Sequence, residues 1–117
     1  MKILKNKPDN FLVLSGDDAL TLPMMHMGAS GVISVIGQSH PKDYSKMVRL
    51  AISGDKESAN LIHYKLYDYY QPLYKEGNPV GIKACLEILG ICKRFVRLPL
   101  VEASDRVKKD LKILLKL

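Results

Sequence analysis

The stretch FLVLSGDDALTLPMMHMGASGVISVIGQSHP, residues 11–41, decides the fold of this chain. It contains two short apolar runs, Phe11–Leu14 and Val32–Ile36, which are rich in Val, Ile and Phe and do not alternate with polar residues. Such runs are typical of strands that are buried on both faces of a parallel sheet. The segment between them is too long for a hairpin turn and long enough for a crossover helix, so we predict a β-α-β unit.

Glycine and small polar residues follow each predicted strand at its carboxyl end. Ser15-Gly16-Asp17-Asp18 follow the first strand, and Gly37-Gln38-Ser39 follow the second. In a parallel α/β barrel the chemistry lies in the loops at this end of the strands. The two loops are therefore candidates for part of the base of an active site.

Helical periodicity begins after the second strand and continues to the end of the chain. It predicts a helix over residues 42–53, ended by Gly54, and a second from about Lys56 to Tyr70. Pro72 and the Gly77-Asn78-Pro79 turn close this second helix.

Two more helices are predicted downstream. The third has Asn78 as its N-cap and Pro79 at its first helical position, and it ends at Gly90. We expect it to bury Ile82, Cys85, Leu86 and Leu89. An extended connector follows, and Ser104 caps a last helix whose apolar face carries Val107, Leu111, Leu114 and Leu115.

The predicted order is unusual for a self-standing α/β domain. Two parallel strands make a sheet with both edges unpaired, and such edges favour aggregation. Strands that are apolar on both faces also imply neighbours that the chain does not contain. The sequence therefore predicts a part of a larger α/β fold.

Composition narrows the classes of function. The formal charge is +6, but Lys and Arg are spread along the chain and do not alternate with aromatic residues, which favours a solvated basic surface over a nucleic-acid site. No apolar run approaches the roughly 20 residues of a membrane span, and residues 1–10 lack a signal-peptide core. Cys85 and Cys92 suit free thiols in a reducing cytosol, so we expect neither a metal site nor a cofactor.

Three segments together carry a family resemblance. They are SGDDALTLPMMHMGASGVISV (15–35), GDKESANLIHYKLYDYYQPLYKEGNPVGIKACLEILGI (54–91) and VRLPLVEAS (96–104). The chain resembles the C-terminal part of the dihydrodipicolinate synthase family, within the class I aldolase superfamily that includes N-acetylneuraminate lyase. The resemblance implies the seventh and eighth strands of a TIM barrel with their helices in residues 1–54, and a C-terminal helical domain in residues 55–117.

The size of the chain fits only part of such a barrel. A TIM barrel takes about 250 residues, and this chain has 117. Met1 also falls within the helix that would precede the seventh strand. We expect a truncated gene, a partial gene model or a piece excised from a longer protein.

The resemblance implies a chemistry for the full-length enzyme. Members condense pyruvate with aspartate semialdehyde in lysine biosynthesis, through a Schiff base on a lysine at the end of the sixth strand, as cytoplasmic tetramers or dimers. A Schiff-base lysine must be buried with a lowered pKa. No lysine follows either predicted strand, and Lys83 suits a structural or solvent-facing role. We therefore expect no catalytic residue in this chain and no activity from it alone.

Two residues match pocket positions of the family. The resemblance implies that Ile33 contacts the bound keto acid and that Gly16 leaves room for the substrate. Without the resemblance, the sequence suggests only that Ile33 is an aliphatic residue of the core and that Gly16 is a turn glycine. Asp17 and Asp18 are either a catalytic carboxylate pair or, as we favour, helix-capping and loop-stabilising residues.

The three histidines are weaker candidates. His26 lies on a helix face that resembles the family's dimer–dimer contact. His40 precedes Pro41 in the loop after the second strand, where it either approaches a substrate or is an ordinary surface residue. His63 is most simply a packed or exposed helix residue.

Two other functional interpretations remain open at this point. Within the superfamily, the chain could be a fragment of N-acetylneuraminate lyase or a related keto-acid aldolase, because the deciding residues lie upstream. Outside enzymes, it could be a non-catalytic helical interaction module.

Overall fold

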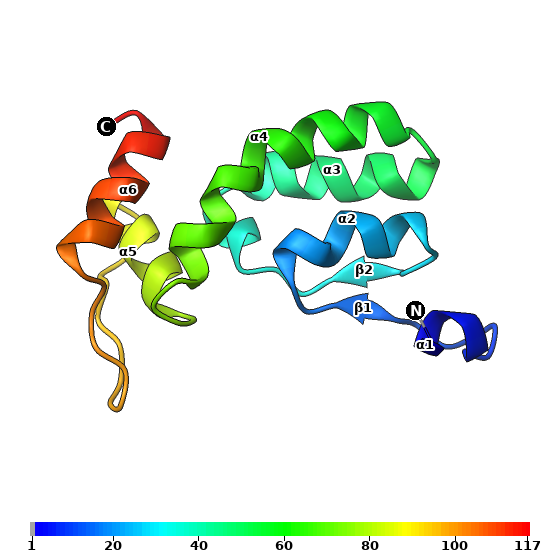
Figure 1. Ribbon diagram of the computed structural model, residues 1–117, viewed down its shortest axis with the longest axis horizontal. Helices are drawn as coiled ribbons and strands as arrows, with labels where there is room; N and C mark the ends of the chain where they lie inside the picture. Colours follow the sequence, from blue (N-terminus) through cyan, green and yellow to red (C-terminus); the bar gives the residue numbers. More distant parts are fainter. Residues whose placement is uncertain (1) are drawn as a thin grey trace.

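The computed structural model describes residues 2–117 and pairs a small parallel sheet with a layer of helices (Figure 1). The elements in chain order are α1 (Lys2–Asn6), β1 (Leu14–Ser15), α2 (Asp18–His26), β2 (Gly31–Val32), the 3₁₀ helix η1 (Ile36–Gln38), α3 (Pro41–Ser53), α4 (Lys56–Tyr74), α5 (Val80–Ile88) and α6 (Asp105–Leu115). The two strands are parallel, with Leu14 opposite Gly31 and Ser15 opposite Val32. Helix α2 connects them, which confirms the predicted β-α-β unit.

The strands are much shorter than predicted. Phe11–Leu14 and Val32–Ile36 were expected as strands, but regular pairing covers only Leu14–Ser15 and Gly31–Val32. At one end, the Phe11 amide bonds to the Pro8 carbonyl in a turn (3.0 Å). At the other, the chain turns into η1 at Ile36. A ladder extends only where a neighbour runs alongside, and each strand has a single neighbour among residues 2–117.

Local signals placed the ends of two helices correctly. Helix α3 ends at Ser53, and Gly54 follows in the left-handed region with φ of 86°, as a C-terminal glycine should. Helix α6 begins after Ser104, whose hydroxyl accepts a hydrogen bond from the Val107 amide (3.4 Å).

Three details of the helix predictions were wrong. Helix α4 continues through Pro72 to Tyr74, because the packing of the fully buried Leu73 outweighs the hydrogen bond that proline cannot donate. Helix α5 starts at Val80 with Pro79, not Asn78, as its N-cap, because the Val80 amide is held by the Gly77 carbonyl in a turn (3.1 Å). Leu89 is exposed, since the helix ends just before it.

The core lies between the helices and on one side of the sheet. Figure 1 shows α2 and α3 above the strands, with α4 packed along α3. Side chains from all five longer helices are buried in one cluster: Leu22, Met47, Leu66, Leu73, Ile82, Val107 and Leu111. Helix α5 approaches the end of α4 so closely that a Cβ on Gly81 would overlap the carbonyl of Leu73.

The predicted division of the chain at residues 54 and 55 stays a prediction. Helix α4, which follows this boundary, contacts α2 and α3, which precede it. Among the helices of residues 2–117, none is both long and apolar enough to cross a membrane.

Candidate active-site segment

Gly16 and Ile33 lie side by side at the carboxyl ends of the two strands. The Ile33 amide donates to the Ser15 carbonyl (2.9 Å), which holds the residue after β2 against the residue before Gly16. The Ile33 side chain is 74% exposed, and nothing lies within 4 Å of a Cβ built on Gly16. The two residues thus form an open, uncharged ledge. Their role as substrate contacts stays a prediction.

Asp17 stabilises the loop after β1. Its Oδ1 accepts a hydrogen bond from the Leu20 amide (3.0 Å), which makes it the N-cap of α2. Its carbonyl accepts from the hydroxyls of Ser15 and Thr21, both at 2.8 Å. These bonds satisfy amides and hydroxyls at the helix start, and they support the capping interpretation of Asp17.

Asp18 is the most unusual residue of the segment, because its side chain is fully buried. Its carboxylate accepts hydrogen bonds from two side chains and two backbone amides. The donors are Ser34 Oγ (2.6 Å) to Oδ1, Ile36 N (2.7 Å) and Tyr74 Oη (2.8 Å) to Oδ2, and Val35 N (3.2 Å) to both oxygens. These hydrogen bonds satisfy both oxygens of the buried side chain.

Tyrosine side chains complete the surroundings of Asp18. Burial raises the pKa of Tyr44, Tyr70 and Tyr74, and the neighbouring Asp18 adds to the increase. These phenols therefore stay protonated at neutral pH and available as donors. Tyr44 uses its hydroxyl to donate to Thr21 Oγ1 (2.8 Å), next to the Asp18 carbonyl (3.2 Å).

This arrangement suits Asp18 to holding a backbone in place, and less to moving protons. Both oxygens are occupied by donors from three parts of the chain, so neither is directed toward open solvent. What the carboxylate fixes is the turn Ser34–Ile36, which directly follows Ile33. Sequence reasoning placed Asp18 in the loop but missed Ser34 and Tyr74 as its partners, since no local pattern links them.

The strand ends contain no lysine. None occurs in the sequence between Lys7 and Lys42, the stretch that holds both strands and both loops. Lys83 lies on the first turn of α5 and is partly exposed. Within residues 2–117, His, Cys, Asp and Glu side chains form no group of three that could hold a metal ion.

The three histidines lie apart from the ledge formed by Gly16 and Ile33. His26 is exposed at the last position of α2, a nine-residue helix that spans about 13 Å from the strand ends. His63 is buried on α4, with Nδ1 3.4 Å from the hydroxyl of Tyr70, and burial lowers its pKa.

His40 contributes to a separate cavity. Its ring packs against that of Tyr69 in a tilted arrangement, with ring centroids 4.4 Å apart, and its Nδ1 is hydrogen-bonded to Ser39 Oγ (2.9 Å). The cavity has a volume of about 500 Å³ and lies between α3, α4 and the end of α6. His40 is half-buried, and which of its two predicted roles applies, a substrate contact or an ordinary surface residue, stays a prediction.

The chain matches one protein family along its whole length. The model of the dihydrodipicolinate synthetase family matches residues 1–117. The 4-hydroxy-tetrahydrodipicolinate synthase of Flavobacterium psychrophilum is 44% identical over 116 residues, which are 99% of this chain and 40% of that protein. The synthase of Aquifex aeolicus is also 44% identical, over 98% of this chain and 39% of its own.

Solved structures agree with this match. The crystal structure of dihydrodipicolinate synthase from Aquifex aeolicus superposes with a TM-score of 0.93 at 43% identity, over 98% of this chain and 39% of that one. The synthase of Thermotoga maritima gives a TM-score of 0.91 at 35% identity, over 96% and 38%. The chain thus spans about two fifths of the length of these relatives and has the fold of their C-terminal part.

Proposed function

The chain belongs to the dihydrodipicolinate synthetase family, and we propose that it acts as the C-terminal part of a 4-hydroxy-tetrahydrodipicolinate synthase. In that role it contributes to the condensation of pyruvate with aspartate semialdehyde through a Schiff base, a step of lysine biosynthesis in the cytoplasm. The observation that carries the proposal is the pair Gly16 and Ile33, held together at the carboxyl ends of two parallel strands.

The proposed division of labour follows from the residues present. Ile33 and Gly16 line the keto-acid pocket, and the Schiff-base lysine comes from the part of the barrel that precedes this chain in its relatives. The absence of lysine between Lys7 and Lys42 supports this division, because a strand-end amine is what the chemistry needs. The chain by itself is therefore inactive, and the complete enzyme is an oligomer.

A fusion tests the proposal directly. The part of the Aquifex aeolicus synthase that precedes the matched region is joined in one polypeptide to the 117 residues. This fused synthase should consume pyruvate and aspartate semialdehyde. A soluble, folded fusion that lacks synthase activity would contradict the assignment.

The isolated chain provides the matching test of inactivity. Incubated with pyruvate and sodium borohydride, it should show no increase in mass, whereas the fused synthase should gain one reduced pyruvate adduct per chain. Stoichiometric trapping on a lysine of the isolated chain would overturn the proposed division of labour.

A further inference from the structure

We propose that Tyr74 is a positioning residue for substrate binding, because it fixes, through the carboxylate of Asp18, the backbone that carries Ile33. The proposal rests on the proposed function, in which Ile33 contacts the keto acid. It deepens that function by naming a residue on which the contact depends. Tyr74 lies at the end of α4, outside the strands and the loops that follow them.

The side chain of Ile33 is positioned mainly by its own backbone. It is 74% exposed within the described part of the chain, so few side chains there restrict its direction. The Ile33 amide donates to the Ser15 carbonyl (2.9 Å), which aligns the residue with β1. The pairing of the two strands ends at Val32, just before it. The backbone that follows Ile33 therefore needs another anchor.

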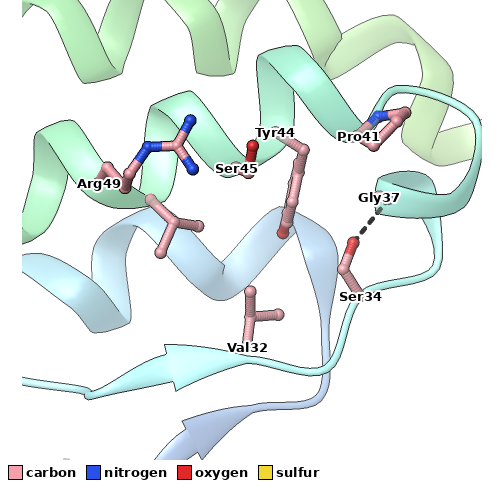
Figure 2. A pocket seen from close by; sticks show the side chains of 8 residues that line it. Val32, Ser34, Gly37, Pro41, Tyr44, Ser45 and Arg49 are labelled. Atoms are coloured by element: carbon pink, nitrogen blue, oxygen red, sulfur yellow. Dashed lines mark hydrogen bonds between the residues drawn. The ribbon is translucent and has the colours of Figure 1, made fainter.

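The carboxylate of Asp18 provides this anchor. It accepts hydrogen bonds from Ser34 Oγ (2.6 Å), Val35 N (3.2 Å) and Ile36 N (2.7 Å), which belong to three successive residues. Ser34 extends the restraint by one more residue, because its Oγ accepts a hydrogen bond from the Gly37 amide (2.8 Å, Figure 2). A single buried carboxylate thus holds the whole turn after β2.

Tyr74 in turn holds the carboxylate. The carboxylate group of an aspartate rotates easily about its last side-chain bond. The Tyr74 hydroxyl donates to Oδ2 (2.8 Å), the same oxygen that accepts from the Ile36 amide. Within residues 2–117, Tyr74 is the only donor to this carboxylate from outside the β-α-β unit and its loops. Its hydrogen bond therefore restricts the rotation of Asp18 from a separate element.

The end of α4 is a firm support for Tyr74. Pro72 and Leu73, the two residues before it, are buried. Helix α5 lies next to this end of α4 in Figure 1, so close that a Cβ on Gly81 would overlap the Leu73 carbonyl. After the helix, the Gly77 amide donates to the Tyr74 carbonyl (3.0 Å). Packing and hydrogen bonding on both sides thus define where the Tyr74 hydroxyl lies.

Tyr69 offers a matched control for Tyr74. Both tyrosines belong to α4, and each donates one hydrogen bond through its hydroxyl. The Tyr69 hydroxyl donates to the Leu114 carbonyl of α6 (2.8 Å), not to the turn after β2. Tyr69→Phe therefore removes a hydrogen bond from the same helix and leaves the restraint on Asp18 intact.

The kinetics of the fused synthase test the proposal. Tyr74→Phe should raise the KM for pyruvate about threefold to tenfold and change kcat by less than about twofold, because a displaced Ile33 weakens binding without removing a reacting group. A purely structural loss would lower the fraction of folded enzyme, which reduces kcat and leaves KM unchanged. Tyr69→Phe should change neither constant by more than about twofold. An unchanged KM in Tyr74→Phe, or an equal rise in both variants, would overturn the proposal.

A double-mutant cycle shows whether Tyr74 acts through Ile33. In Ile33→Ala the side chain that Tyr74 positions has been removed. Adding Tyr74→Phe to this variant should therefore raise the KM for pyruvate further by less than about twofold. If Tyr74→Phe raises KM by the same factor with and without the Ile33 side chain, Tyr74 does not act through Ile33.

Hydrogen exchange in the isolated chain separates this proposal from the proposed function, because it requires no activity. Tyr74→Phe should speed the exchange of the Ile33 and Gly37 amides at least about threefold relative to Tyr69→Phe. If these amides respond but a soluble fusion is inactive, the proposed function fails and the restraint by Tyr74 stands. If the fusion is active but neither KM nor exchange responds, the positioning proposal fails and the proposed function stands.

Discussion

The hydroxyl of Tyr74 donates a hydrogen bond to Oδ2 of Asp18 over 2.8 Å, although the two residues lie 56 positions apart in the sequence. The same oxygen accepts from the Ile36 amide (2.7 Å). The end of α4 is thereby tied to the turn that follows Ile33, so the position of the proposed substrate-binding residue depends on a helix of the C-terminal region.

Replacing the Asp18 carboxylate should destabilise the chain. In Asp18→Asn one oxygen becomes an amide that cannot accept from Ile36 or Tyr74, which leaves buried donors unpaired. We expect the free energy of unfolding in urea to fall by about 2–3 kcal/mol. Asp17→Asn is the matched control, since asparagine caps helices about as well as aspartate. A loss of similar size in both variants would contradict the distinct role of Asp18.

Removing the Tyr74 hydroxyl should have a smaller and localised effect. Tyr74→Phe should lower the free energy of unfolding by about 1–2 kcal/mol, because one hydrogen bond to a buried carboxylate is lost. Hydrogen exchange should speed up at the Val35 and Ile36 amides, which bond to Asp18. Tyr64→Phe is the control, since Tyr64 is 69% exposed. Unchanged exchange at both amides would show that Tyr74 does not hold the turn.

Shortening Ile33 should affect the enzyme and spare the fold. In the fused synthase, Ile33→Ala should raise the KM for pyruvate, with a loss of about 1–3 kcal/mol if the side chain packs against the substrate. Because Ile33 is 74% exposed, the stability of the isolated chain should change by less than about 0.5 kcal/mol. Unchanged kcat and KM would remove Ile33 from the pocket.

Mild acid should destabilise the chain through His63. Burial lowers the pKa of His63 in the folded chain. As the pH falls, the unfolded chain therefore binds a proton near the ordinary histidine pKa of about 6.5, before the folded chain binds one. The stability that neutral His63 contributes above pH 6.5 is lost as the pH falls from 6.5 through the lowered pKa of the folded state. The urea concentration at the unfolding midpoint should decrease as the pH is lowered from 7.5 to 5.5. This pH dependence should be weaker in His63→Gln. His26→Gln, at an exposed site, should keep the wild-type dependence; the reverse pattern would contradict the prediction.

Much of the fold could be predicted because its signals are local. Gly54 ends α3 and Ser104 begins α6 through contacts within a few residues of each position. The β-α-β order also predicted that the loops after the two strands lie at one edge of the sheet, since the carboxyl ends of parallel neighbours meet there. The register that places Gly16 next to Ile33 is seen only in the structure. Family membership was predicted from three sequence segments and confirmed by the family model.

The lengths of the elements could not be predicted in the same way. Strand pairing stops where the partner strand diverges, and α4 passes through Pro72 because the buried Leu73 and the bonded Tyr74 lie beyond it. At Gly81 the structure shows a close approach between α5 and the Leu73 carbonyl that leaves no room for a side chain.

The sequence by itself determined the parallel β-α-β unit, the glycine that ends α3 and the serine that caps α6, because each depends on periodicity or on contacts a few residues apart. Only the tertiary structure decided that Asp18 is a buried anchor. Its donors Ser34, Ile36 and Tyr74 lie 16, 18 and 56 positions away, and they meet only after α2, η1 and α4 have packed together. A carboxylate whose partners are that distant looks, in sequence, like any other residue of a helix N-terminus.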